Sequence, residues 1–198
     1  MTLKVTPLRG PELAAHLPEL ARLRVTVFRE YPYLYAGSAD YEETYLRPLL
    51  QTPDALVVLA WDGAAVVGAS SALPLTQETE ALQRPLLNSP YDPAKVLYLG
   101  ESVLLPEYRG RGLGHAFFDH REAHAAQLGL GVTAFCAVQR PEQHPARPQP
   151  ERSLHAFWAA RGYREHPELA ATLHWPEIPP PLGTGQDTAH PMHFWVRA

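Results

Sequence analysis

The pattern of apolar and polar positions divides the chain into strand-like and helix-like segments. Alternating or continuous apolar runs, typical of strands, fall at residues 3–8, 55–61, 64–73, 95–105, 131–138, 163–175 and 192–196. Apolar residues recur at helical spacing in residues 11–31, 41–50, 76–87, 113–128 and 151–161. This order of strands and helices predicts an α/β fold, with a mixed sheet that carries helices on its faces.

Local signals sharpen these boundaries. The pair Asp62-Gly63 between two apolar runs is typical of a hairpin turn. Pro18 lacks the N–H that an interior helical turn needs, so it divides the first helix or begins its second half. Ser38 or Asp40 can cap the second helix, because a short polar side chain accepts a bond from the first free N–H groups.

The main chemical signal is a glycine-rich loop at residues 109–114, between an apolar strand and a helix. The N–H groups at a helix N-terminus have no intrahelical acceptor, and the helix dipole there favours an anion. Glycines at 110, 112 and 114 let the backbone come close to a ligand, and arginines at 109 and 111 add bidentate donors. We therefore expect this loop to bind phosphate groups.

Three other interpretations of the loop fit less well. A dinucleotide fingerprint needs G-x-G-x-x-G, but the third glycine comes one residue early at Gly114 and His115 stands in its place. A Walker A loop needs a Gly-Lys-Ser/Thr ending, which this loop lacks. The simplest alternative is a structural turn, and three alternating glycines framed by two arginines favour phosphate binding over it.

The segment from Val103 to Gly114 resembles the acyl-CoA-binding motif of the GNAT acyltransferases, Q/R-x-x-G-x-G/A after an apolar strand. Arg109, Gly112 and Gly114 fill its three named positions. Residues 153–163, which end in Gly-Tyr, resemble the second cofactor-side helix of that family. The resemblance implies one GNAT-like domain over residues 1–198, with a mixed, mostly antiparallel sheet of about six to seven strands flanked by helices.

The resemblance also implies acetyl-CoA as cosubstrate, with no metal. The loop amides would hold the pyrophosphate, and the pantetheine arm would lie where the strand before the loop splays from the strand that starts near Gly131. A backbone N–H there would face the thioester oxygen. The implied cofactor-binding residues are Val103, Leu104, Leu105, Arg109, Gly110, Arg111, Gly112, Leu113, Gly114 and Trp158.

Glu101 is the candidate general base, because most aliphatic amines are protonated at neutral pH and must lose a proton before they attack. It lies in an apolar strand between Gly100 and Ser102, where a carboxylate costs free energy unless it is paired or functional. In the family that the chain resembles, a glutamate on this strand often has this role. The alternative is that Glu101 points to solvent or pairs with an arginine.

The general acid departs from the family pattern. The family often uses a tyrosine just before the closing Gly-aromatic pair, and Trp158 occupies that position here. Trp158 has no acidic proton, so His155, one turn earlier, or Tyr163 is the candidate substitute. The need for an acid is mild, since a thiol with a pKa of roughly 8.5 is a tolerable leaving group.

The acceptor site is expected at the first two helices and the loop between them, where aromatic and acidic residues gather. Aromatic rings with carboxylates can enclose a cationic amine. The alternative is a packed aromatic loop over a capped helix. The candidate substrate-binding residues are Tyr31, Tyr33, Tyr35 and Glu42.

Composition narrows the partners. The formal net charge of −4 lacks the basic footprint of nucleic-acid binding, and no stretch is long and apolar enough to span a membrane. The single cysteine, Cys136, excludes an internal disulfide, so a cytoplasmic location is expected. His120 and His124 lie four apart, but no third metal ligand is evident.

The favoured hypothesis is an N-acetyltransferase that acts on a primary amine of a small molecule or a peptide, as a monomer or a homodimer. The first alternative is a non-catalytic acyl-CoA-binding sensor or interaction domain. The second is a nucleotide-binding protein of another fold, which would bind ATP or NAD at least as well as CoA.

Overall fold

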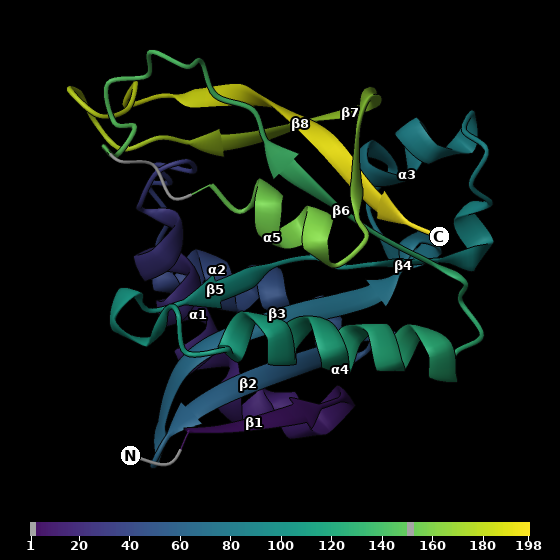
Figure 1. Cartoon of the computed structure of the whole chain (residues 1–198). Helices are drawn as coiled ribbons and strands as arrows, with labels where there is room; N and C mark the ends of the chain where they lie inside the picture. The colour runs from purple at the N-terminus through teal and green to yellow at the C-terminus, as the bar shows by residue number, and fades with distance from the viewer. Residues whose placement is uncertain (1–2, 150–152) are drawn as a thin grey trace.

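A computed structural model describes residues 3–149 and 153–198 (Figure 1). The helices are α1 (Leu17–Phe28), α2 (Ala39–Leu46), α3 (Glu80–Leu87), α4 (Leu113–Gln127) and α5 (His155–Ala160). The strands are β1 (Leu3–Leu8), β2 (Leu56–Asp62), β3 (Ala65–Pro74), β4 (Val96–Tyr98), β5 (Ser102–Leu104), β6 (Val132–Val138), β7 (Arg164–Pro176) and β8 (Asp187–Arg197). No helix in the described part of the chain is long and apolar enough to cross a membrane.

The strands form one sheet of eight strands in the order β1-β2-β3-β4-β6-β8-β7, with β5 paired to β3. Strands β4 and β6 run parallel, and the other pairs are antiparallel. The expected mixed, mostly antiparallel sheet flanked by helices is confirmed. The strand number exceeds the expected six to seven because one predicted strand is two.

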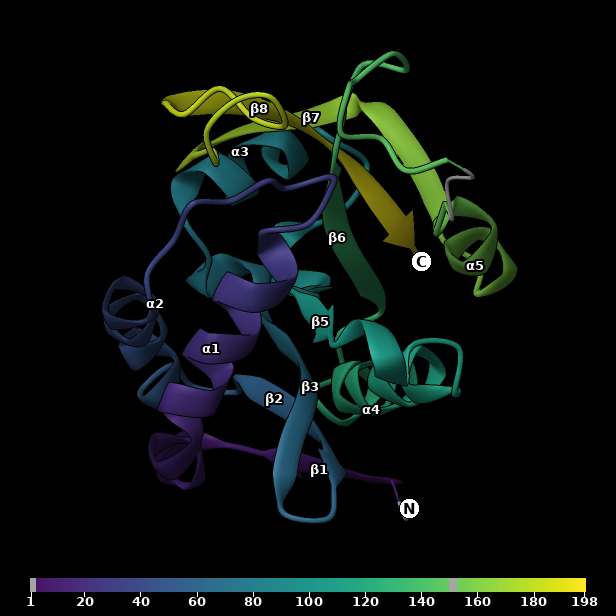
Figure 2. The ribbon, with the colours of Figure 1, turned by 90° about the vertical axis from the view of Figure 1, so that its left-hand side faces the viewer.

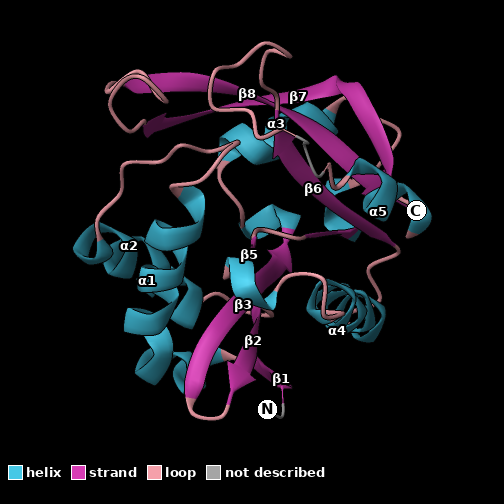
Figure 3. Ribbon diagram, turned by 60° about the vertical axis from the view of Figure 1, so that its left-hand side comes forward, coloured by secondary structure: helices cyan, strands magenta, loops and turns pink. Residues whose placement is uncertain are grey.

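Helices cover both faces of the sheet. Helices α1 and α2 lie on one side of β1–β3 and α4 lies on the other (Figures 2 and 3). Val57 and Leu59 of β2 pack with α1, whereas Leu56, Val58 and Ala60 pack with α4. A strand buried on both faces reads as a continuous apolar run, which explains the pattern at residues 55–61.

Several predicted boundaries shift. The first predicted helix is divided as expected: a 3-10 helix spans Gly10–His16, and α1 begins at Leu17 with Pro18 in its first turn. Ser38, rather than Asp40, caps α2 by accepting a bond from the Tyr41 N–H. Helix α5 begins at His155, later than predicted, and the predicted start at Glu151 lies outside the described residues.

The prediction of one continuous strand over residues 95–105 is wrong, because a β-bulge divides it. Gly100 and Glu101 both lie opposite Ser71 of β3: the Gly100 N–H donates to the Ser71 carbonyl (3.0 Å), and the Ser71 N–H donates to the Glu101 carbonyl (3.0 Å). The Ser71 hydroxyl accepts from the Glu101 N–H (3.2 Å). An extra residue bends a strand and increases its twist, so β5 leaves the direction of β4.

Candidate functional site

The sheet opens at the bulge. Strand β4 stays paired with β6 as far as Leu99, whose N–H donates to the Ala134 carbonyl (2.8 Å). Beyond that point β5 pairs with β3, and in the described structure it has no partner on the side of β6. The expected splay between these strands is therefore present.

The backbone of β5 offers free hydrogen-bonding groups to this opening. The Glu101 carbonyl and the Leu105 N–H both bond to β3. Backbone groups alternate in direction along an antiparallel strand, so those of Ser102 and Leu104 point away from β3. The Leu104 carbonyl accepts a bond from Arg109 Nε (3.1 Å). An extended ligand can therefore hydrogen-bond here as a strand would.

The glycine loop lies between β5 and α4. Gly110 (φ +77°) and Gly112 (φ +83°) take left-handed conformations that side chains disfavour. Gly112 is the N-cap of α4 and has no capping side chain, so the first-turn N–H groups stay available to an anion. A Cβ on Gly114 would lie 3.7 Å from the Phe157 ring, so α5 packs closely over this turn.

The two arginines of the loop are held differently. Arg109 forms an ion pair with Glu30 at the end of α1 (2.8 Å), which ties the loop to the first helix. The guanidinium of Arg111 lies over the Tyr108 ring, 5.4 Å from its centroid. Arg109 therefore shapes the loop, and Arg111 supplies positive charge beside it.

Glu101 projects from the bulge toward α1, where its carboxylate forms an ion pair with Arg24. Arg24 also pairs with Glu42 of α2, and the Tyr35 hydroxyl donates to the second oxygen of Glu42 (2.5 Å). The Glu101 side chain is 17% exposed, whereas that of Glu42 is 1% exposed. Glu101 is thus paired with an arginine, as the structural alternative proposed, and it is also partly open.

Arg121 of α4 supports the bulge from the opposite face. It is 2% exposed, and its Nη1 donates to the carbonyls of Ser71 (3.4 Å) and Glu101 (3.3 Å). Burial lowers the pKa of Arg121 to about 10. The helical spacing of residues 113–128 predicts the helix that contains Arg121. It does not predict the contact between Arg121 and the bulge.

The two candidates for the acid step, His155 and Tyr163, lie near Trp158 at α5. His155 is exposed and stacks against Trp158 (ring centroids 5.5 Å apart), which packs on Phe135. Tyr163 is 1% exposed; its hydroxyl donates to Glu122 (3.2 Å), and burial raises its pKa to about 12. No contact in the described residues joins His155 or Tyr163 to Glu101.

The expected acceptor residues divide into two groups. The Tyr31 ring lies near that of His144 (5.7 Å), and the Tyr33 ring lies near those of Phe28 (4.6 Å) and Trp175 (5.6 Å). Tyr35 and Glu42 differ from the expectation: both are buried in the network around Arg24, so they do not offer a free aromatic face or a free carboxylate. For these two residues the packed-loop alternative describes the structure better.

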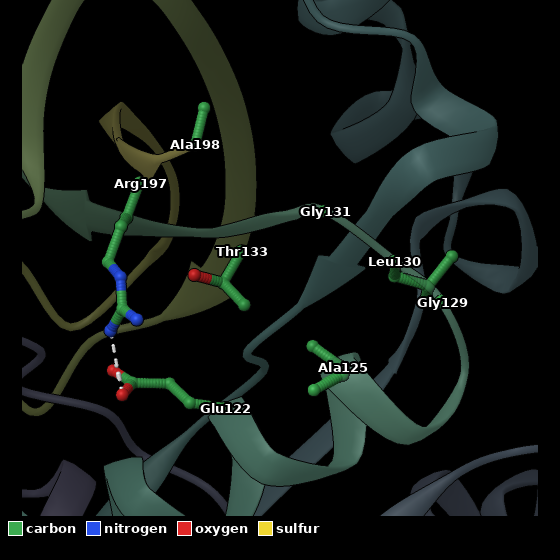
Figure 4. A pocket seen from close by; sticks show the side chains of 9 residues that line it. Glu122, Ala125, Gly129, Leu130, Gly131, Thr133, Arg197 and Ala198 are labelled. Atoms are coloured by element: carbon green, nitrogen blue, oxygen red, sulfur yellow. Dashed lines mark ion pairs between the residues drawn. The ribbon is translucent and has the colours of Figure 1, made fainter.

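A cavity of about 500 Å³ lies at the C-terminal end of α4 (Figure 4). Its carboxylate, Glu122, is paired with Arg197 (2.7 Å). Glu122 comes ten residues after Gly112, so about 15 Å of helix separates this cavity from the glycine loop. The described residues contain no group of three metal-ligating side chains, and His124 bonds a backbone carbonyl and Arg9 instead.

Known proteins resemble this chain in sequence pattern and in fold. The model of the acetyltransferase (GNAT) family matches residues 20–165. No curated protein matches the chain. Similar solved structures include an acetyltransferase from Thermus thermophilus, with 17% identity, a TM-score of 0.57 and coverage of 100% of this chain and 97% of that one.

Two further structures are similar over nearly their whole length. Arabidopsis thaliana NAA60 in complex with acetyl-CoA has 15% identity, a TM-score of 0.59 and coverage of 99% of this chain and 98% of that one. The ribosomal-protein-alanine N-acetyltransferase from Brucella melitensis has 15% identity, a TM-score of 0.59 and coverage of 97% and 98%. At these identities the likeness shows a shared fold.

Proposed function

The chain belongs to the acetyltransferase (GNAT) family, and from that premise we propose that it transfers the acetyl group of acetyl-CoA to a primary amine, with Glu101 as the general base. The observation that carries the proposal is the position of Glu101 at the bulge. There the free edge of β5 begins, and the strand then leads directly into the glycine loop.

The cosubstrate side rests on donors that fit its chemistry. The N–H groups at the start of α4 and the charge of Arg111 suit the pyrophosphate. The outward backbone groups of Ser102 suit an extended pantetheine arm, and the outward Leu104 N–H is the candidate donor to the thioester oxygen as it becomes an oxyanion.

The acceptor side rests on Glu101. The ammonium of the acceptor gives a proton to Glu101, directly or through water, and the freed lone pair attacks the thioester carbon. The C–S bond then breaks, the CoA thiolate leaves and takes up a proton, and the second nitrogen proton passes to solvent. His155 and Tyr163 stay candidates for the acid step. The need for an acid is small, because a thiol with a pKa of roughly 8.5 is a tolerable leaving group.

Calorimetry with acetyl-CoA tests the glycine loop. Gly112→Ala and Gly129→Ala form a matched pair, because both glycines have positive φ, both flank α4, and a Cβ meets nothing within 4 Å at either. The backbone cost is therefore similar, about 1 kcal/mol. We expect Gly112→Ala to weaken acetyl-CoA binding at least several-fold and Gly129→Ala to leave it unchanged. Equal effects, or ATP that competes as well as CoA, would overturn the loop assignment.

Kinetics of Glu101→Gln test the base. We expect acetyl-CoA affinity close to that of the wild type and turnover lower by about 10²- to 10⁴-fold. Undiminished turnover would remove Glu101 from the mechanism.

A non-catalytic acyl-CoA sensor is the second candidate function. It is favoured by Trp158, which packs on Phe135 and Trp195 at the position where an acid was expected. The two functions differ in one assay: both bind acetyl-CoA, but only the enzyme releases free CoA thiol when an amine library is added.

A further inference from the structure

One guanidinium in this site forms ion pairs with two carboxylates. Arg24 binds Glu101 through Nη1 and Glu42 through Nε. The side chains of Arg24 and Glu42 are 11% and 1% exposed, so the group is largely removed from water. With both glutamates ionised, the trio carries one cation and two anions and thus a net charge of −1.

This charge balance changes when Glu101 takes up a proton. The trio then becomes a neutral pair of Arg24 and Glu42, and a partly buried site favours the state with less net charge. Without Glu42 the ionised state of Glu101 is the favoured one. The Arg24–Glu101 pair is then neutral, and a proton on Glu101 leaves Arg24 as an unpaired buried cation.

We propose that Glu42 is a positioning residue that makes Glu101 able to act as a base, because it holds Arg24 and keeps the guanidinium paired when Glu101 is protonated. This inference rests on the proposed role of Glu101. The Tyr35 hydroxyl, by donating to Glu42, keeps the carboxylate turned toward Arg24.

No other group around Glu101 in the described residues takes the place of Arg24 at its carboxylate. Those that interact with it electrostatically come from the 31–35 loop, α2, the segment after β3, and α4: Tyr33, Tyr45, Glu78 and Arg121. The phenols are neutral near pH 7, and Arg121 bonds the Glu101 carbonyl rather than its carboxylate. Within the described residues, Arg24 is the cation that contacts the carboxylate.

The first experiment is a carbon-13 NMR titration of the Glu101 carboxyl, assigned with Glu101→Gln, in the full chain. In Glu42→Gln we expect its midpoint to fall by on the order of one pH unit, since Arg24 then acts on Glu101 alone. In Arg24→Gln/Glu42→Gln, which removes the cation that contacts the Glu101 carboxylate, we expect the midpoint to rise above that of Glu42→Gln. Glu43→Gln, a change at the next residue of α2, is the matched control and should leave the midpoint in place.

The second experiment is the pH profile of kcat/KM with one fixed amine, so that the acceptor contributes equally in every variant. In Glu42→Gln the acid limb should move in the same direction as the midpoint, and turnover near neutral pH should fall about three- to ten-fold. An unmoved Glu101 midpoint in folded Glu42→Gln would overturn the proposal. A moved midpoint with an unmoved profile would also overturn it, because Glu101 would then not be the base whose protonation controls the reaction. The titration requires no turnover, so failure of this inference is distinguishable from failure of the proposed base.

Discussion

At the scale of single residues, one buried histidine has hydrogen-bond partners that fix its protonation. His124 of α4 is 1% exposed; its Nε2 bonds the Asp54 carbonyl (2.7 Å) and its Nδ1 faces Arg9 Nη2 (3.0 Å). A carbonyl only accepts and a guanidinium only donates, so the ring must be neutral, with its proton on Nε2. A second ring proton has no place in this arrangement.

We therefore expect the stability of the protein to fall in mild acid. Burial lowers the pKa of His124 in the folded state, so below about pH 6.5 the unfolded chain binds more protons, and the free energy of unfolding decreases as the pH falls. Urea unfolding at pH 7.5 and pH 5 measures this loss. His124→Gln should show less of it, whereas His120→Gln on the same helix should keep it. An equal loss in both variants would mean that a group other than His124 causes the loss of stability at pH 5.

At the scale of elements, the β-bulge is what regular patterns could not predict. Apolar runs placed the strands, and helical spacing placed α1, α2 and α4. Residues 95–105 read as one strand because Gly100 and Glu101 interrupt it by only two positions. A glycine inside a strand is a known sign of a bulge, so Gly100 was the available signal. The partners of Glu101 could not be found this way, since Arg24 lies 77 residues earlier.

The bulge makes a testable prediction about Gly100 and Ser71. A Cβ on Gly100 would lie 2.6 Å from Ser71 Oγ, so Gly100→Ala should turn that hydroxyl away from the Glu101 N–H and cost about 1 kcal/mol. Ser71→Ala has already lost the hydroxyl, so Gly100→Ala should cost little more in that background. A double-mutant cycle from urea unfolding measures this coupling. Additive costs would mean that the clash is relieved elsewhere.

At the scale of the whole molecule, distant segments meet around the loop at residues 31–35. The Ala36 N–H donates to the Pro176 carbonyl (2.8 Å), and the Ile178 N–H donates to the Leu34 carbonyl (2.7 Å), which joins the loop to the end of β7. Arg140, after β6, donates to two loop carbonyls and pairs with Glu177. The loop is thus fixed by two distant regions of the chain, and no short-range pattern in the sequence could predict that.

Arg140→Gln should loosen this junction. It removes one partner of a buried ion pair, which typically costs about 3 to 5 kcal/mol. Amide hydrogen exchange should accelerate more at Ala36 and Ile178 than in the centre of β2. Arg161→Gln, which breaks an ion pair with Glu122 on α4, is the control and should leave those two amides protected. Uniform acceleration in both variants would show global destabilisation instead.

The bulge also makes the stability of the fold and the binding of a ligand compete for the same backbone groups. A regular strand through residues 96–104 could pair with β6 along its whole length, and each added ladder bond would stabilise the fold. The same bonds would occupy the free edge that a ligand needs. Selection for thermal tolerance alone would therefore favour sequences that close the sheet, and such variants should gain melting temperature while they lose affinity for the acyl donor.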